Sequence, residues 1–154
     1  NLLVLAAEGF RAVGGDMAEA ALKRARESLD RWNLDAKLEQ RGLLHLPLTD
    51  GSADAVVDSM ASQHLSVPDH LGAYREAFRV LGKGGAFLCV HLAEATSDYR
   101  VLFPGSPWAW LAPTEKLVAI LRQAGFASVE WDSVVRTCKG GKHRAVYVVA
   151  EAVK

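Results

Sequence analysis

Asp16 stands at the end of a strand-like segment, where an acidic side chain is well placed to bind a ligand. It follows Gly14 and Gly15 in the predicted strand 10–16. A carboxylate at the carboxyl end of a strand can accept hydrogen bonds from both hydroxyls of a ribose. The same residue type also begins turns and caps helices, so a purely local role for Asp16 is the alternative.

His64 and His91 are the candidates for proton transfer. A histidine titrates near neutral pH and can remove a proton from a hydroxyl or an acidic carbon. His64 lies beyond the apolar run 53–60, and His91 ends the apolar run 86–91. Both are therefore expected near the ends of strands, facing a cleft. A structural or solvent-facing histidine is the alternative for each.

Aromatic side chains gather in the segment 93–113, which is rich in Trp, Pro and Ser. The segment is longer than an ordinary connection, and we interpret it as an irregular lid or binding insertion. Tyr99, Trp108 and Trp110, together with Phe103, would wall an apolar pocket for a small-molecule substrate. A small satellite core beneath a long loop is the alternative.

The elements that must position these residues alternate between strands and helices. Hydrophobic spacing and turn residues predict helices over 2–8, 17–31, 68–81 and 114–124, and strands over 10–16, 36–38, 53–60, 86–91, 129–137 and 145–153. Thr114 is expected to cap the last helix. The alternation predicts a mostly parallel sheet with helices on both faces, and a final hairpin that adds an antiparallel strand. Such sheets bind ligands beyond the carboxyl ends of their strands, where we expect Asp16, Ser59 and His91.

Composition limits the classes of protein to consider. The 154 residues are 50% hydrophobic and 23% charged, which is typical of one globular domain spanning 1–154. Basic and acidic residues number 18 each, so no net positive field favours nucleic acid as a partner. The sequence shows no membrane span or signal peptide, and we expect a cytoplasmic protein. Cys89 and Cys138 are far apart and lack metal-type spacing, so we expect both to be reduced and buried, with no metal site.

Four stretches, taken in order, resemble the class I S-adenosylmethionine-dependent methyltransferase family across essentially the whole chain. They are 12–17 (AVGGDM), 46–57 (LPLTDGSADAVV), 77–85 (AFRVLGKGG) and 121–126 (LRQAGF). The closing hairpin is similar to the reversed seventh strand that separates this fold from dinucleotide-binding dehydrogenases. The resemblance implies a Rossmann-like three-layer α/β sandwich with S-adenosylmethionine as cofactor and S-adenosylhomocysteine as its product.

The resemblance also implies roles for particular residues. Asp16 would bind the ribose, and Met17 would lie against the adenine ring, unless it makes an ordinary core or cap contact. Many family members carry an acid where Gly42 stands, so backbone groups of Gly42 and Leu43 would take over the adenine contact. The alternative is that Leu43 and Leu44 belong to the core. Ser59 and Met60, at the end of the next strand, are also expected to contact the cofactor.

The family's first strand and its Gly-x-Gly loop have no counterpart in the sequence, because residues 1–8 resemble the helix that follows them. We expect that segment to lie upstream of this chain. Without it the sheet lacks a central strand, and the cofactor lacks the cradle for its amino-acid part.

The sequence therefore predicts transfer of a methyl group from S-adenosylmethionine to an O, N or C atom of a small-molecule acceptor, without a metal. One alternative is a binding module or pseudoenzyme that keeps the fold. The other is a nucleotide-dependent oxidoreductase, since Asp16 would also suit its ribose, although the closing hairpin speaks against that fold. Neither the acceptor nor the oligomeric state follows from the sequence.

Overall fold

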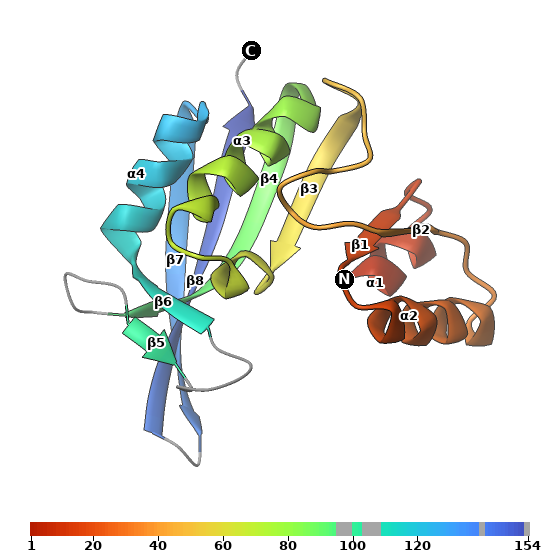
Figure 1. Cartoon of the computed structure of the whole chain (residues 1–154), viewed down its shortest axis with the longest axis horizontal. Coiled ribbons are helices and arrows are strands. Elements are labelled where there is room, and N and C mark those ends of the chain that lie inside the picture. The colour runs from red at the N-terminus through yellow and green to blue at the C-terminus, as the bar shows by residue number, and fades with distance from the viewer. Residues whose placement is uncertain (95–99, 103–108, 139–140, 153–154) are drawn as a thin grey trace. The chain divides into compact units, whose positions relative to one another are not determined.

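The computed structural model divides the chain into two compact units, residues 1–47 and 48–154 (Figure 1). Backbone is described for residues 1–94, 100–102, 109–138 and 141–152, and side chains for residues 1–92 and 112–134. Each unit is described by itself, and the expectation of one domain stays a prediction.

The first unit is a small α/β unit. Its elements are α1 (Leu2–Ala7), β1 (Val13–Asp16), α2 (Glu19–Arg31) and β2 (Lys37–Gln40). β1 and β2 pair in parallel, with Asp16 opposite Gln40, and form a two-stranded sheet of their own. Leu29 of α2 is completely buried in the core of this unit, and leucines of α1 pack against it. All four predicted elements are confirmed, with bounds shifted by a few residues.

The second unit contains a six-stranded sheet. Its elements are β3 (Ala53–Ser59), η1 (Ser62–His64), α3 (Asp69–Val80), β4 (Leu81–Glu94), β5 (Arg100–Leu102), β6 (Ala109–Pro113), α4 (Thr114–Ala124), β7 (Ser128–Cys138) and β8 (Gly141–Ala152). The strand order is β5-β6-β4-β8-β7, and β3 pairs with β4. β3 and β6 run parallel to β4, whereas β8 runs antiparallel to both β4 and β7. The predicted antiparallel hairpin is confirmed.

Helices α3 and α4 lie side by side on one face of this sheet (Figure 1). Tyr74 of α3, Leu117 and Leu121 of α4, and Phe87 of β4 form the centre of the core. The apolar spacing within 68–81 predicts a core stripe that contains Tyr74, Ala77 and Leu81, which are buried as expected, and also Leu71 and Phe78. Both are only partly buried, because the core face of the helix is rotated toward His70, Ala73 and Val80.

Three sequence predictions about the second unit are wrong. The segment 93–113 is not wholly irregular, since β4 runs on to Glu94 and β5 pairs antiparallel with β6. The glycines of 82–85 do not separate α3 from a later strand, because Leu81 already pairs with Ala53 and the glycines form a bulge before Ala86. Thr114 is the first helical residue of α4 and makes no capping hydrogen bond, since Pro113 precedes it at the cap position.

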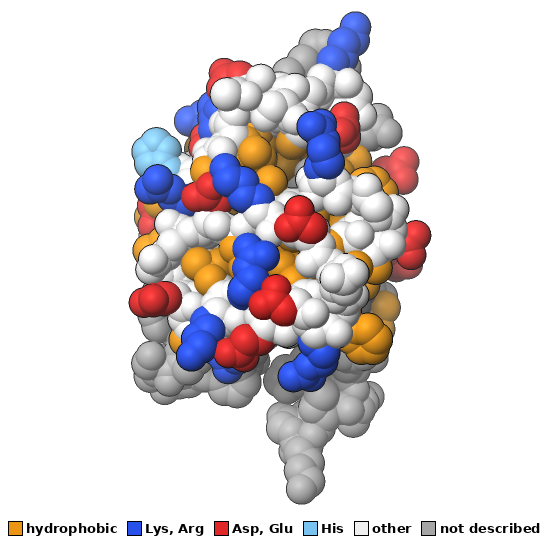
Figure 2. All heavy atoms as spheres, turned by 90° about the vertical axis from the view of Figure 1, so that its right-hand side faces the viewer, with side chains coloured by type: hydrophobic (Ala, Val, Ile, Leu, Met, Phe, Trp, Pro, Cys, Tyr) orange, Lys and Arg blue, Asp and Glu red, His pale blue; other side chains and the backbone are white. Residues whose placement is uncertain are grey.

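None of the helices in the described part of the chain has the length and apolar character that a bilayer crossing needs. On the face shown in Figure 2, basic and acidic side chains alternate, and neither sign forms a continuous patch. This distribution agrees with the equal numbers of basic and acidic residues in the sequence.

Candidate functional site

Asp16 ends β1 with its side chain exposed, as predicted. Its Oδ1 accepts a hydrogen bond of 2.8 Å from the backbone N–H of Ala18, just before α2 begins. A carboxylate has about four acceptor positions, so this one bond leaves capacity for a ligand. The local role and the ligand-binding role are therefore compatible, because the turn holds the carboxyl group in place at the end of the strand.

Met17 and Gly42 lie next to each other in the first unit. The Sδ atom of Met17 is 2.9 Å from the position that a Cβ would take on Gly42, and the Met17 side chain is 71% exposed. Backbone and side-chain bonds fix this corner, since Arg41 N–H donates to the carbonyl of Asp16 and Gln40 Nε2 donates to that of Met17. Gly42 thus provides the space in which Met17 lies.

The predicted adenine contacts of Gly42 and Leu43 fall on the loop that follows β2. Leu43 is partly buried, whereas Leu44 is 44% exposed. A core role is therefore excluded for Leu44 and stays possible for Leu43. Asp16 also lines a hollow of about 150 Å³, together with Gly14 and Gly15 of β1 and with Ala21, Leu22 and Ala25 of α2.

In the second unit, Ser59 and Met60 leave β3 at its carboxyl end, and both are exposed. Met60 adopts a left-handed backbone conformation with φ +63°. Its N–H donates a hydrogen bond of 2.8 Å to the carbonyl of Val90 in β4. Non-glycine residues at positive φ are uncommon, and the surrounding structure must hold them there.

A buried polar network surrounds the turn that follows Met60. Asp58 is 6% exposed, and its Oδ1 accepts the N–H groups of Ala61 at 2.9 Å and Ser62 at 3.2 Å. The Ser62 hydroxyl lies 3.1 Å from that of Tyr74, and the Ser62 carbonyl accepts a 2.9 Å hydrogen bond from His70 Nε2. β3, η1 and α3 are joined through these bonds.

Burial sets the proton affinities within this network. It raises the pKa of the Tyr74 hydroxyl well above its ordinary value, and the neighbouring Cys89 adds to the effect. Burial is also the main cause that raises the pKa of the Cys89 thiol, and the nearby Asp58 is the second cause. Cys89 is free and completely buried, as predicted, and its raised pKa keeps it an unreactive thiol at neutral pH. The Cys138 side chain lies outside the described residues.

The two predicted histidines differ sharply in their surroundings. His64 ends η1 and is exposed. His91 is completely buried, and it lies inside β4 rather than at the end of that strand, so the expectation that it faces an open cleft is wrong. Its Nδ1 donates a 2.6 Å hydrogen bond to the Leu92 carbonyl, while its Nε2 has no partner among the described residues. Burial, assisted by the neighbouring His70, lowers the pKa of His91 to about 4.

The predicted acceptor pocket cannot be assembled from the described side chains. Tyr99, Phe103 and Trp108 lie outside the described residues, and Trp110 is described only as a backbone position in β6, opposite Val101. Within the described residues, no group of three or more His, Cys, Asp or Glu side chains could hold a metal ion.

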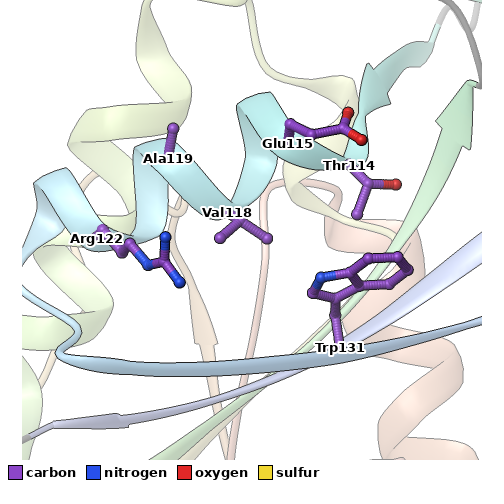
Figure 3. A pocket seen from close by; sticks show the side chains of 6 residues that line it. All are labelled: Thr114, Glu115, Val118, Ala119, Arg122 and Trp131. Atoms are coloured by element: carbon purple, nitrogen blue, oxygen red, sulfur yellow. The ribbon is translucent and has the colours of Figure 1, made fainter.

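A separate hollow of about 260 Å³ lies between α4 and β7 (Figure 3). Trp131 of β7 faces Thr114 and Val118 of α4, Glu115 lies next to Thr114, and Arg122 lies farther along the helix. None of the residues predicted to bind cofactor or acceptor lines this hollow.

Sequence reasoning missed the buried polar network around the turn that follows Met60. Asp58 was treated as part of an apolar strand, and His70 was not assigned a place in the core. The available signal was the pair Asp58-Ser59, which follows the apolar residues 55–57 and consists of two residue types that favour turns.

Comparisons with known protein structures identify the fold. The chain superimposes on an S-adenosylmethionine-dependent methyltransferase from Methanosarcina mazei with a TM-score of 0.83 and 17% identity, covering 98% of this chain and 86% of that one. It matches Burkholderia thailandensis 1,6-didemethyltoxoflavin-N1-methyltransferase, which contains bound 1,6-didemethyltoxoflavin and S-adenosylhomocysteine, at a TM-score of 0.77 and 17% identity, covering 96% and 64%. The [4+2]-cyclase SpnF matches at a TM-score of 0.80 and 16% identity, covering 99% and 71%.

These superpositions show a methyltransferase-like α/β fold and confirm the predicted fold class. No curated protein matches the chain. The family model described as a methyltransferase domain matches residues 1–85, which is more than half of the chain. The chain therefore belongs to the methyltransferase-domain family. The predictions of S-adenosylmethionine as cofactor and of methyltransferase activity are confirmed at the level of the family, and the oxidoreductase alternative is set aside.

Proposed function

We propose that this chain transfers a methyl group from S-adenosylmethionine to an O, N or C atom of a small-molecule acceptor, and that Asp16 binds the ribose of the cofactor. The observation that carries the proposal is the exposed Asp16 carboxyl group, held at the carboxyl end of β1 by the Ala18 N–H. Membership of the methyltransferase-domain family supports the choice of cofactor.

Met17, Gly42 and Leu43 complete the proposed adenosine contacts. Met17 lies over Gly42, so an exposed thioether is available to an adenine ring next to Asp16. Gly42 has no side chain to compete for that space, and its backbone groups and those of Leu43 are the proposed partners of the adenine edge.

The small-molecule class of the acceptor rests on likeness in fold. The Burkholderia enzyme contains 1,6-didemethyltoxoflavin, and a Haemonchus contortus phosphoethanolamine N-methyltransferase 2 contains phosphomonomethylethanolamine. SpnF, which is named for a cyclisation, shows that this fold also serves other reactions. A cytoplasmic location is proposed on the sequence grounds given above.

Methyl transfer from a sulfonium already has a good leaving group, so the protein mainly has to align donor and acceptor and exclude water. Where the acceptor must lose a proton, His64 is the proposed base because it is exposed at the end of η1. His91 is a weaker candidate, since it is fully buried and its lowered pKa makes it a poor proton acceptor. Replacement of His64 by Ala should lower kcat and leave the affinity for S-adenosylhomocysteine unchanged.

The decisive experiment is calorimetric titration of S-adenosylhomocysteine into this chain and, in parallel, into a form extended upstream. Asp16→Asn should weaken binding at least tenfold, because a hydrogen bond to a charged group contributes roughly 1.5–3 kcal/mol. Asp35→Asn is the matched control, since Asp35 is an exposed acid of the same unit. Equal affinity of the Asp16 variant and the wild type would contradict the ribose contact, and binding without methyl transfer to any acceptor would favour a binding module.

A further inference from the structure

The carboxyl group of Asp58 binds the backbone of the turn at residues 59–62. Asp58 Oδ1 accepts both the Ala61 and Ser62 N–H groups, and its Oδ2 lies 3.7 Å from the Cys89 Sγ. Among the described side chains, no lysine or arginine forms an ion pair with Asp58. The main polar partners of this buried acid are therefore the backbone amides of the turn.

An acid buried to this degree is costly unless its bonds compensate for the lost hydration. A valine or leucine at the end of β3 would pack on β4 without that cost. Such a residue could not hold the two amides, which would then have to find other acceptors. The hydrogen bonds of Asp58 thus fix the conformation of the turn more directly than they stabilise the core.

The turn in question determines where Met60 lies. Met60 has φ +63°, and the amides bonded to Asp58 belong to the two residues that follow it. The Met60 N–H is bonded to Val90 on the other side. The left-handed conformation is thereby fixed from β4 before the residue and from Asp58 after it.

Three further hydrogen bonds hold this turn and η1 in place. Ser62 is held at its hydroxyl by Tyr74 and at its carbonyl by His70, both from α3. The Gln63 side chain accepts the N–H of Leu92 through Oε1 at 3.2 Å. η1, which carries His64 at its end, is therefore anchored to both α3 and β4.

We propose that Asp58 is a positioning residue for methyl transfer, which fixes the turn 59–62 and so holds Met60 at the carboxyl end of β3 for contact with the cofactor. The inference rests on the proposed function, because it requires a bound S-adenosylmethionine, and it takes the contact of Met60 with that cofactor from the sequence analysis. Asp58 itself touches neither cofactor nor acceptor. Alignment of donor and acceptor governs the rate of methyl transfer, and small displacements of a contacting residue are expected to weaken cofactor binding.

The test compares Asp58→Ala, Asp58→Asn and Asp54→Ala. Asn retains an Oδ1 that can accept both amides, and Asp54 is an exposed acid on the same strand, so its loss is the matched control. Asp58→Ala should raise the dissociation constant for S-adenosylhomocysteine about tenfold and speed amide exchange of Ala61 and Ser62 at least about tenfold. Asp58→Asn should stay within about threefold of the wild type in both measurements, and Asp54→Ala should match it.

A merely structural role for Asp58 would lower the melting temperature and leave the affinity of the folded protein unchanged, and that result would overturn the proposal. If Asp58→Ala does not fold, Tyr74→Phe decides the question, since it removes the hydroxyl bonded to Ser62 and keeps the ring in the core. The expected result is a severalfold weaker affinity, and an unchanged affinity would overturn the proposal. A wild-type protein that binds no S-adenosylhomocysteine would instead contradict the proposed function, because amide exchange tests the turn without any ligand.

Discussion

Burial of His91 should make the second unit less stable as the pH falls. The pKa of His91 is lowered from 6.5 to about 4, a difference of about 2.5 units, which corresponds to roughly 3 kcal/mol. In the unfolded chain the imidazole binds a proton near pH 6.5, whereas in the folded chain it stays neutral until about pH 4. The unfolded state therefore binds more protons between these values, and stability is lost as the pH falls from 6.5 toward 4.

The expected loss at pH 5 is about 2 kcal/mol relative to pH 7.5, because the folded histidine is still almost wholly neutral there. His70 adds to the effect in the same direction, since burial lowers its pKa as well. The two rings meet edge to face, with centroids 5.7 Å apart. His91→Leu removes the larger contribution and also removes the Nε2 atom that has no partner.

Urea unfolding at pH 7.5 and pH 5.0, followed by tryptophan fluorescence, measures this difference. The background substitution Trp32→Phe places every remaining tryptophan in residues 48–154, and Trp32 is 68% exposed, so its loss should be mild. His91→Leu should lose about 2 kcal/mol less than the wild type on acidification. The control His64→Ala removes an exposed imidazole that contributes least to the lowered pKa of His91, so this variant should keep most of the loss caused by His91. The same pH dependence in His91→Leu and in the wild type would refute the reasoning.

Three further substitutions test packing and charge. Gly125→Ala should cost about 2 kcal/mol or more in thermal unfolding, because Gly125 has φ +120° and an added Cβ would lie 2.9 Å from the Phe78 ring; wild-type stability would contradict this. Gly14→Ala should cost about 1–2 kcal/mol by placing a methyl group 2.8 Å from a leucine of α1, and the control Gly15→Ala, which meets only atoms at 3.9 Å, should show no such loss. Arg79→Met should cost up to about 1 kcal/mol in low salt and less in high salt, since the guanidinium pairs with two acidic side chains and is partly exposed; an effect independent of salt would argue against the ion pairs.

Most helices and strands could be predicted because their signals are local. The spacing of apolar residues in 17–31 and the apolar run 53–60 each depend on one element, and the structure contains α2 and β3 at these places. The start of β4 could not be predicted in this way. Glycines at 82–85 indicate a break, but Leu81 pairs with Ala53, a residue 28 positions earlier. Pairing between distant segments overrides the local signal, and a short stretch of sequence carries no information about such pairing.

The same difference between local and long-range signals applies to the residues of the candidate site. Asp16 could be found because a strand, two glycines and an acid follow one another within a few residues, and the structure leaves it exposed at the strand end. Asp58 was missed because the pair Asp58-Ser59 indicates only a turn, whereas the burial of Asp58 and its bonds to the Ala61 and Ser62 amides depend on tertiary packing. His91 was found for its residue type, but its burial reverses the expected role, since a cleft-facing base needs exposure and a pKa near neutrality.

Most of the buried polar side chains described in the second unit gather around the turn that follows the carboxyl end of β3. Asp58 lies near the end of β3, Ser62 in η1 and His70 in the first turn of α3, and His91 follows the last residue of β4 that pairs with β3. A core built for stability alone would place apolar side chains here, because buried polar groups contribute little even when they are bonded and cost free energy when they are not. The partnerless Nε2 of His91 shows that the cost is not fully offset within the described residues. Since ligands of α/β sheets bind beyond the carboxyl ends of the strands, the position of this cluster supports the positioning role proposed for Asp58.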